Sequence, residues 1–136
     1  MSSIQPLKTQ STQYPAITVK RAERAMRCLP FQLPLFVAMR SQSVPLPAIA
    51  GREGVEHQYI KRPMSELAVE NGLMWLIQVG ILRREVDGQG ITDSFRLTPL
   101  GRQLVDKWEN QGGTIPPASL ADRLYNALSQ WLRLPF

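Results

Sequence analysis

Apolar residues recur at three- and four-residue spacing in five stretches of the chain, and this period predicts five amphipathic helices. Side chains that cap helices stand at most of the predicted starts, where a hydroxyl oxygen accepts a hydrogen bond from a free backbone N–H. Ser119 and Asp122 have the three-residue spacing of a capping box. The predicted helices cover residues 18–29, 34–40, 65–79, 99–110 and 119–132, with Thr18, Ser65, Thr98 and Ser119 as caps and Pro30, Gly80, Gly112 and Gly113 as stops.

The segments between these helices predict a β-hairpin and one irregular stretch. Residues 81–86 and 91–97 contain β-branched and aromatic side chains, and the sequence Asp-Gly-Gln-Gly joins them. An Asp-Gly pair supplies the positive φ that a tight hairpin turn requires. Prolines and glycines interrupt residues 42–63, where we expect a short extended piece at 43–46, a helical turn at 48–52 and a loop through Tyr59.

The chain has 136 residues, of which 43% are hydrophobic and 20% charged, so a single domain can bury a core of its own. Cys28 is the only cysteine, which excludes a disulfide framework. No stretch has the ~20 apolar residues of a membrane span and the polar N-terminus lacks a signal-peptide pattern, so we expect a cytoplasmic protein. We expect a flexible polar arm at 1–17, the main domain at 18–110, a linker at 111–118 and a C-terminal amphipathic helix at 119–136.

Positive charge is concentrated in the first half of the chain. The formal net charge is +5, and residues 18–62 alone hold eight Lys or Arg against three Glu. Lys20, Arg24 and Arg27 follow one another at helical spacing and form a basic stripe on the first predicted helix. The excess favours an anionic partner such as nucleic acid, while a solvated helix face is the alternative for the stripe itself.

The chain carries none of the common catalytic or cofactor-binding motifs. His57 is the only histidine, so no metal site is indicated. A pair of Cys28 and His57 stays open, although a thiol on an apolar helix end is usually buried and inert. Glu66 and Glu70 lie four residues apart on one helix, and we interpret them as solvent-facing acids. We therefore expect a non-enzymatic protein without a metal or cofactor.

The last predicted helix carries a continuous apolar stripe, which has to be buried against another surface. Packing against its own domain and packing against a second copy of the chain both stay open, because small proteins often form dimers through terminal helices. A homodimer is thus one expectation. The stripe consists of Leu120, Leu124, Leu128, Trp131 and Leu132.

Residues 73–104 contain a helix that ends in a glycine, an apolar pair followed by two arginines, a Gly-containing turn, and a return strand that ends in Leu-Thr before a new helix. The residues of this pattern are Gly80, Ile81, Leu82, Arg83 and Arg84, then Asp87 and Gly88, then Phe95, Arg96, Leu97, Thr98, Pro99, Leu100 and Gly101. The segment, about a quarter of the chain, resembles the winged helix-turn-helix domains of MarR-like and PadR-like bacterial transcriptional regulators. We therefore expect a mainly α fold with a small β-hairpin (α+β), specifically a winged helix-turn-helix with an additional C-terminal helix.

The resemblance implies that residues 65–79 form a recognition helix in the major groove and that residues 83–97 form a wing along the DNA backbone. Asn71 and Gln78 are then the possible base readers, and nearby lysines and arginines are the phosphate ligands. We therefore predict a transcriptional regulator that binds duplex DNA. Its candidate nucleic-acid contacts are Lys61, Arg62, Asn71, Gln78, Arg83, Arg84 and Arg96, with Lys20, Arg24 and Arg27 from the basic stripe.

The predicted recognition helix departs from the family pattern in its charge. It carries Glu66 and Glu70 but no basic residue, and the predicted turn at 87–90 has no arginine for the minor groove. A non-catalytic module that docks onto a protein or ribonucleoprotein therefore stays open as the alternative. Pairing of the two acids with Arg62 or Arg84 would favour DNA, and exposed, central acids would favour docking. The candidate docking contacts are Glu66, Glu70, Trp75, Leu124, Leu128 and Trp131.

Overall fold

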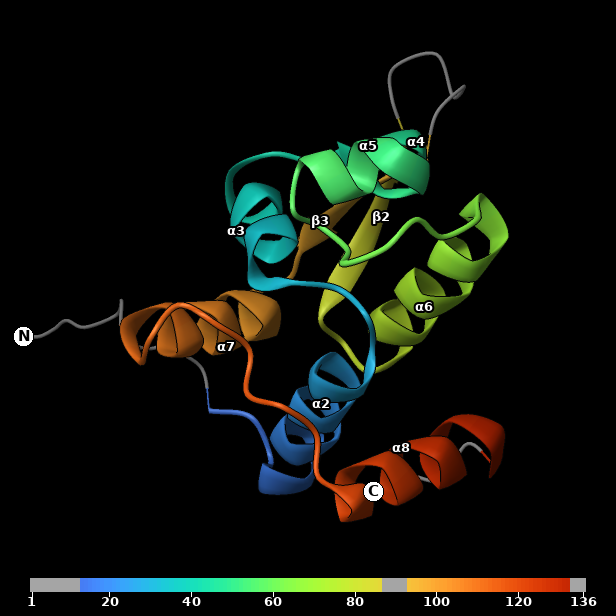
Figure 1. Ribbon diagram of the computed structural model, residues 1–136. Helices are drawn as coiled ribbons and strands as arrows, with labels where there is room; N and C mark the ends of the chain where they lie inside the picture. The colour runs from blue at the N-terminus through green and yellow to red at the C-terminus, as the bar shows by residue number, and fades with distance from the viewer. Residues whose placement is uncertain (1–12, 87–92, 133–136) are drawn as a thin grey trace, which may run out of the picture.

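Helices surround a small antiparallel sheet in the computed structural model, which describes residues 13–86 and 93–132 (Figure 1). The main domain comes first along the chain and a last helix lies beside it, at the end far from the sheet. The mainly helical fold with a small sheet confirms the α+β class expected from the sequence. In chain order the elements are α2 (Ala16–Cys28), α3 (Leu33–Ser41), β1 (Val44–Pro45), α4 (Leu46–Ile49), α5 (Gly51–Glu56), α6 (Glu66–Gln78), β2 (Leu82–Val86), β3 (Asp93–Leu97), α7 (Pro99–Asn110) and α8 (Leu120–Leu132).

The sheet has three strands in the order β1-β3-β2, and both pairings are antiparallel. Leu82 pairs with Leu97 and Arg84 pairs with Phe95, so β2 and β3 form the predicted hairpin. Phe95 also pairs with Val44 on the other side, which confirms the extended piece expected at 43–46. The turn expected at 87–90 lies outside the described residues.

Three of the predicted helix starts have the expected capping bonds. The side chain of Ser65 accepts a hydrogen bond from the Ala68 N–H at 3.1 Å, and Thr98 accepts one from the Gly101 N–H at 3.1 Å. Ser119 and Asp122 bind reciprocally, since each backbone N–H donates to the other side chain, at 3.1 and 3.0 Å. At the other end of α6, Gly80 has a φ of +92°, a left-handed conformation that favours glycine after a helix.

Two local predictions were wrong. Thr18 does not cap the first helix: α2 begins at Ala16, because Pro15 is extended and its carbonyl accepts a hydrogen bond from the Val19 N–H at 3.1 Å. The helical turn expected at 48–52 is part of two short helices, α4 and α5, and the loop expected to follow it is confined to residues 57–59. Gly54 makes this packing possible, because a Cβ atom there would lie 1.7 Å from the carbonyl oxygen of Ile49.

The hydrophobic core lies between the sheet and helices α2, α3, α6 and α7. The sheet contributes Phe95 and Leu97, and α7 buries Trp108 and its apolar neighbours. The contacts of α8 are mainly with α2, and the two helices lie side by side away from the sheet (Figure 1). The main core is therefore assembled without α8.

Candidate functional site

The solvent-facing side of α6 carries neutral and apolar residues. Leu67, Asn71, Met74 and Gln78 recur at helical spacing and are all exposed. Asn71 and Gln78, the predicted base readers, therefore lie on one accessible face. Trp75 points the other way: it is buried, and its Nε1–H donates to Oδ1 of Asn126 at 3.0 Å. Trp75 thus binds α8 instead of presenting a docking surface.

The two acids of α6 differ in their surroundings. Glu66 is exposed and forms no ion pair with any residue in the described ranges. Glu70 is half-buried, with Oε2 4.0 Å from Nη2 of Arg84. Arg84 lies closer to a second acid, at 3.6 Å from Asp93 on β3, and Nη2 also donates to Sδ of Met74 at 3.0 Å. One guanidinium is therefore shared between two carboxylates.

The other hairpin arginines are also paired with carboxylates. Arg83 lies 3.1 Å from Glu85, and Arg96 lies 3.9 Å from the same side chain. Arg96 also donates to the backbone carbonyl of Ser41 at 3.1 Å. Together with Glu66, Glu70 and Asp93, the surface formed by α6 and the hairpin holds four acids against three arginines among the described residues. It is not a positively charged surface.

The predicted basic stripe of α2 lies largely against α8. The Arg24 guanidinium lies 5.3 Å from the ring centroid of Tyr125, in cation–π geometry. Arg27 lies 3.3 Å from Asp122. Lys20 is exposed. Two of the three side chains are therefore engaged in attaching the last helix.

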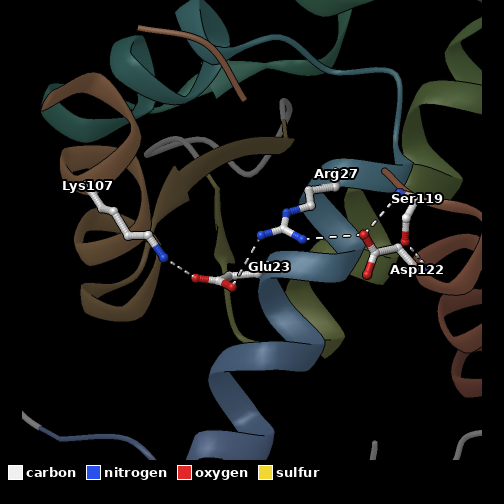
Figure 2. Close-up of polar contacts among 5 residues, drawn as sticks. All are labelled: Glu23, Arg27, Lys107, Ser119 and Asp122. Carbon is white, nitrogen blue, oxygen red and sulfur yellow. Dashed lines mark hydrogen bonds and ion pairs between the residues drawn. The ribbon is translucent and has the colours of Figure 1, made fainter. Parts of the chain in front are cut away.

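A chain of ion pairs connects α7, α2 and α8 (Figure 2). Lys107 lies 2.6 Å from Glu23, and Glu23 lies 3.7 Å from Arg27, which reaches Asp122. The backbone N–H of Ser119 lowers the pKa of the Asp122 carboxyl, and the charge of Arg27 lowers it further. The start of α8 is thus fixed by a cap and by a charged partner on the main domain.

The inner face of α8 is polar and its outer face is apolar. Asn126 and Ser129 are buried toward the main domain, Ser129 completely. Leu120 and Trp131 are 84% and 82% exposed, and Leu124 is exposed as well. Among the described residues, Leu120, Leu124 and Trp131 of the predicted stripe are therefore not packed against the main domain. Leu128 is half-buried at its margin, and the side chain of Leu132 lies outside the described residues.

Lys61 and Arg62, the predicted phosphate ligands before α6, are both exposed and lie at a cleft. They line the cleft together with Arg27 of α2 and Arg123 of α8. The cleft has a volume of 810 Å³ and is bounded by the segments before α3, before α6 and before α8. Sequence reasoning did not find this grouping, because the four cations come from segments far apart in the chain.

Cys28 and His57, the two residues that the sequence left open for chemistry, have different surroundings in the structure. Burial raises the pKa of the Cys28 thiol, so it is held in the weakly nucleophilic protonated form. His57 lies 4.0 Å from Glu53 and stacks on Tyr59. No group of three His, Cys, Asp or Glu side chains within 13–86 and 93–132 could hold a metal ion. In the same ranges, no helix is long and apolar enough to cross a membrane.

A family model for Npun_F0494-like proteins matches residues 12–130. The match spans every helix and strand described above except the last two residues of α8, so the chain belongs to the Npun_F0494-like family. No curated protein and no solved structure matches the chain.

Proposed function

We propose that the chain is a non-catalytic interaction module that self-associates through the outer face of α8 and docks a protein partner through the exposed face of α6. One observation carries the proposal. Of the eight large hydrophobic side chains that are exposed among the described residues, six lie on α6 and α8. Apolar side chains concentrated on two helix faces are typical of surfaces that bind other proteins.

The order of the elements supports a winged-helix scaffold for this module. From α3 to β3 the chain runs helix, strand, two short helices, long helix and two strands, and the sheet order is β1-β3-β2. In this interpretation α6 is the presented helix and β2 and β3 form the wing. α2, α7 and α8 are then additions to the scaffold, and α8 is the one whose apolar face is exposed in the described part of the chain.

The face of α6 favours a protein partner with both apolar and basic groups. Leu67 and Met74 provide apolar contact area. Glu66 adds a negative charge that is unpaired among the described residues, while Arg84 partly offsets the charge of Glu70. Such a face complements a partner that carries Lys or Arg around an apolar centre. The acids would repel phosphates at the same position.

The outer face of α8 is complementary to a second copy of itself. Leu120, Leu124, Ala127 and Trp131 follow the four- and three-residue spacing of a coiled-coil seam. In an antiparallel pair with two-fold symmetry, Leu120 would face Trp131 of the partner subunit, and Leu124 would face Ala127 of the partner subunit. No charged residue interrupts this seam. The same patch would thus cover itself in both copies.

Duplex DNA is the second candidate partner. Asn71 and Gln78 favour it, because both amides are exposed on the helix that a winged-helix protein presents to the major groove. Arg83, Arg84 and Arg96 are the candidate phosphate ligands, but each lies beside a carboxylate that offsets its charge. The excess of acids on this surface makes DNA the weaker candidate.

Binding to random-sequence duplex DNA, followed by fluorescence anisotropy as salt increases, separates the two candidates. The docking proposal predicts little binding even at low salt and no effect of the double variant Arg83→Ala/Arg84→Ala. Binding that falls steeply with salt would instead establish the DNA candidate, provided that the slope becomes shallower by about 0.9 for each phosphate that the variant no longer neutralises.

The α6 docking face is tested by affinity capture with matched variants. Leu67→Glu/Met74→Glu places two charges on the face, and Ile17→Glu/Val86→Glu places two charges at the exposed hydrophobic positions outside α6 and α8. We expect a bound protein to be recovered with the parent chain and with Ile17→Glu/Val86→Glu. The same protein should be lost with Leu67→Glu/Met74→Glu. Equal recovery with both variants would contradict docking through α6.

A further inference from the structure

The cleft around Lys61 and Arg62 has an apolar floor. Met26, Phe31 and Leu33 line it and are almost completely buried, and Ile115 from the connector before α8 packs against the same core. Its volume of 810 Å³ lies within the range of about 300–1,000 Å³ that is usual for small-molecule sites. The cleft can therefore contact apolar atoms of a ligand as well as its charge.

All charged groups that line the cleft are positive. Arg27, Lys61, Arg62 and Arg123 contribute to its walls, and no lining residue is an aspartate or glutamate. Arg27 is engaged with Glu23 and Asp122. Lys61, Arg62 and Arg123 form no ion pair within the described ranges. A low-dielectric hollow with charge of one sign concentrates the field and attracts an anion.

A second hollow continues the cleft toward α3. It has a volume of 410 Å³ and shares Leu33, Pro34 and Gly113 with the first. Val37 and Ala38 add an apolar wall. The only carboxylate that lines it belongs to Glu109, which is held by Arg40 at 2.7 Å. Together the two hollows have a positive end and an apolar end.

We propose that this cleft binds a small amphipathic anion. Lys61, Arg62 and Arg123 hold its carboxylate or phosphate head group, and its apolar body lies over Phe31 and Leu33 toward the second hollow. Guanidinium groups bind carboxylates and phosphates alike through paired hydrogen bonds, so the same residues suit either head group. The site is independent of the docking faces of α6 and α8 and of the proposed function.

Isothermal titration calorimetry with single-chain amphiphiles, below their micelle concentrations, tests the site. The probes are dodecanoate, dodecyl phosphate and the cationic dodecyltrimethylammonium. The test variant is Lys61→Gln/Arg62→Gln/Arg123→Gln. The matched control is Lys20→Gln/Arg52→Gln/Arg102→Gln, which removes the same charge from exposed positions outside the cleft.

We expect one or both anionic probes to bind the parent chain and the control variant, and to bind the test variant at least about 10-fold more weakly, or about 1.4 kcal/mol. Preference for dodecanoate or for dodecyl phosphate identifies the head group. Binding should survive Leu120→Glu/Trp131→Glu, which alters the apolar face of α8. Three results would overturn the proposal. They are binding of the cationic probe as tight as that of the anions, the same loss of binding in the test and control variants, and no binding of either anion to the parent chain.

Discussion

The helices α7 and α8 have similar sequence patterns but opposite orientations toward the core. Each is amphipathic, begins with a hydroxyl cap and carries a tryptophan near its C-terminal end. Trp108 of α7 is 1% exposed, whereas Trp131 of α8 is 82% exposed. An apolar stripe thus predicts the helix itself, but it does not predict that the stripe faces the same chain.

The difference in orientation arises from the surface against which each helix packs. α7 follows β3 directly, and its cap Thr98 ties the helix to the hairpin: the hydroxyl donates to the backbone carbonyl of Gly80, and the backbone N–H donates to the carbonyl of Ile81 at 3.0 Å. Gly101 permits this approach, because a Cβ atom there would lie 2.5 Å from the carbonyl oxygen of Ile81. α8 instead meets a largely polar surface, where Asn126 satisfies the buried N–H of Trp75.

Truncation of the two tryptophans gives the largest expected contrast. Trp108→Ala opens a cavity in the core and should lower the free energy of unfolding by about 3–5 kcal/mol. Trp131→Ala should change it by no more than about 0.5 kcal/mol when the chain is dilute, because the side chain is solvated there. Urea unfolding of both variants measures the contrast. Equal losses would show that the outer face of α8 is buried within one chain.

The two faces of α8 can be compared in the same way. Asn126→Ala leaves the buried Trp75 N–H without an acceptor and should cost about 1–3 kcal/mol. Leu124→Ala on the outer face should be nearly neutral in dilute solution. Removal of the polar side chain would thus cost more stability than removal of the leucine, whereas the opposite is usual. A larger cost for Leu124→Ala in urea unfolding would place the apolar face inside.

The cap of α8 should contribute a smaller, pH-dependent amount. Ser119→Ala removes the cap and should cost about 0.5–2 kcal/mol. The folded chain holds the pKa of Asp122 below its ordinary value, so the unfolded chain binds the proton more readily. The contribution of Asp122 to the free energy of unfolding is therefore present at neutral pH. It is lost as the pH falls below the ordinary pKa range of an aspartate.

Thermal unfolding between neutral and acidic pH measures this contribution. We expect Asp122→Asn to have a smaller loss of stability on acidification than the parent chain. Glu56→Gln, at an exposed acid with no ion pair among the described residues, serves as the control. Identical acid sensitivity of Asp122→Asn and the parent chain would exclude Asp122 as a source of the pH dependence.

Sequence patterns predicted the elements whose stability depends on local chemistry. Ser65, Thr98 and the pair of Ser119 and Asp122 were found correctly, because a cap needs only neighbours within the same turn. The start at Thr18 was wrong, because α2 begins without a side-chain cap. Helix α5 was missed, because it forms through packing around Gly54 and not through apolar periodicity.

The candidate sites were less predictable than the fold, since they depend on long-range contacts. The partners of Arg84 lie across the hairpin and on α6, so its charge balance was not visible in the chain order, whereas Arg83 pairs with Glu85 on the same strand. The cleft was not foreseen for the same reason. Trp75 was the one available signal that α8 packs through a polar face. It lies in an apolar helix, and a buried indole N–H needs a hydrogen-bond acceptor from another element.

Sedimentation velocity over a wide range of protein concentration tests the central claim, that the outer face of α8 binds a second copy. We predict reversible dimer formation by the parent chain and by Ile17→Glu/Val86→Glu, and a monomer for Leu120→Glu/Trp131→Glu at every concentration. A parent chain that stays monomeric throughout, or a dimer that persists in the α8 variant, would contradict the account.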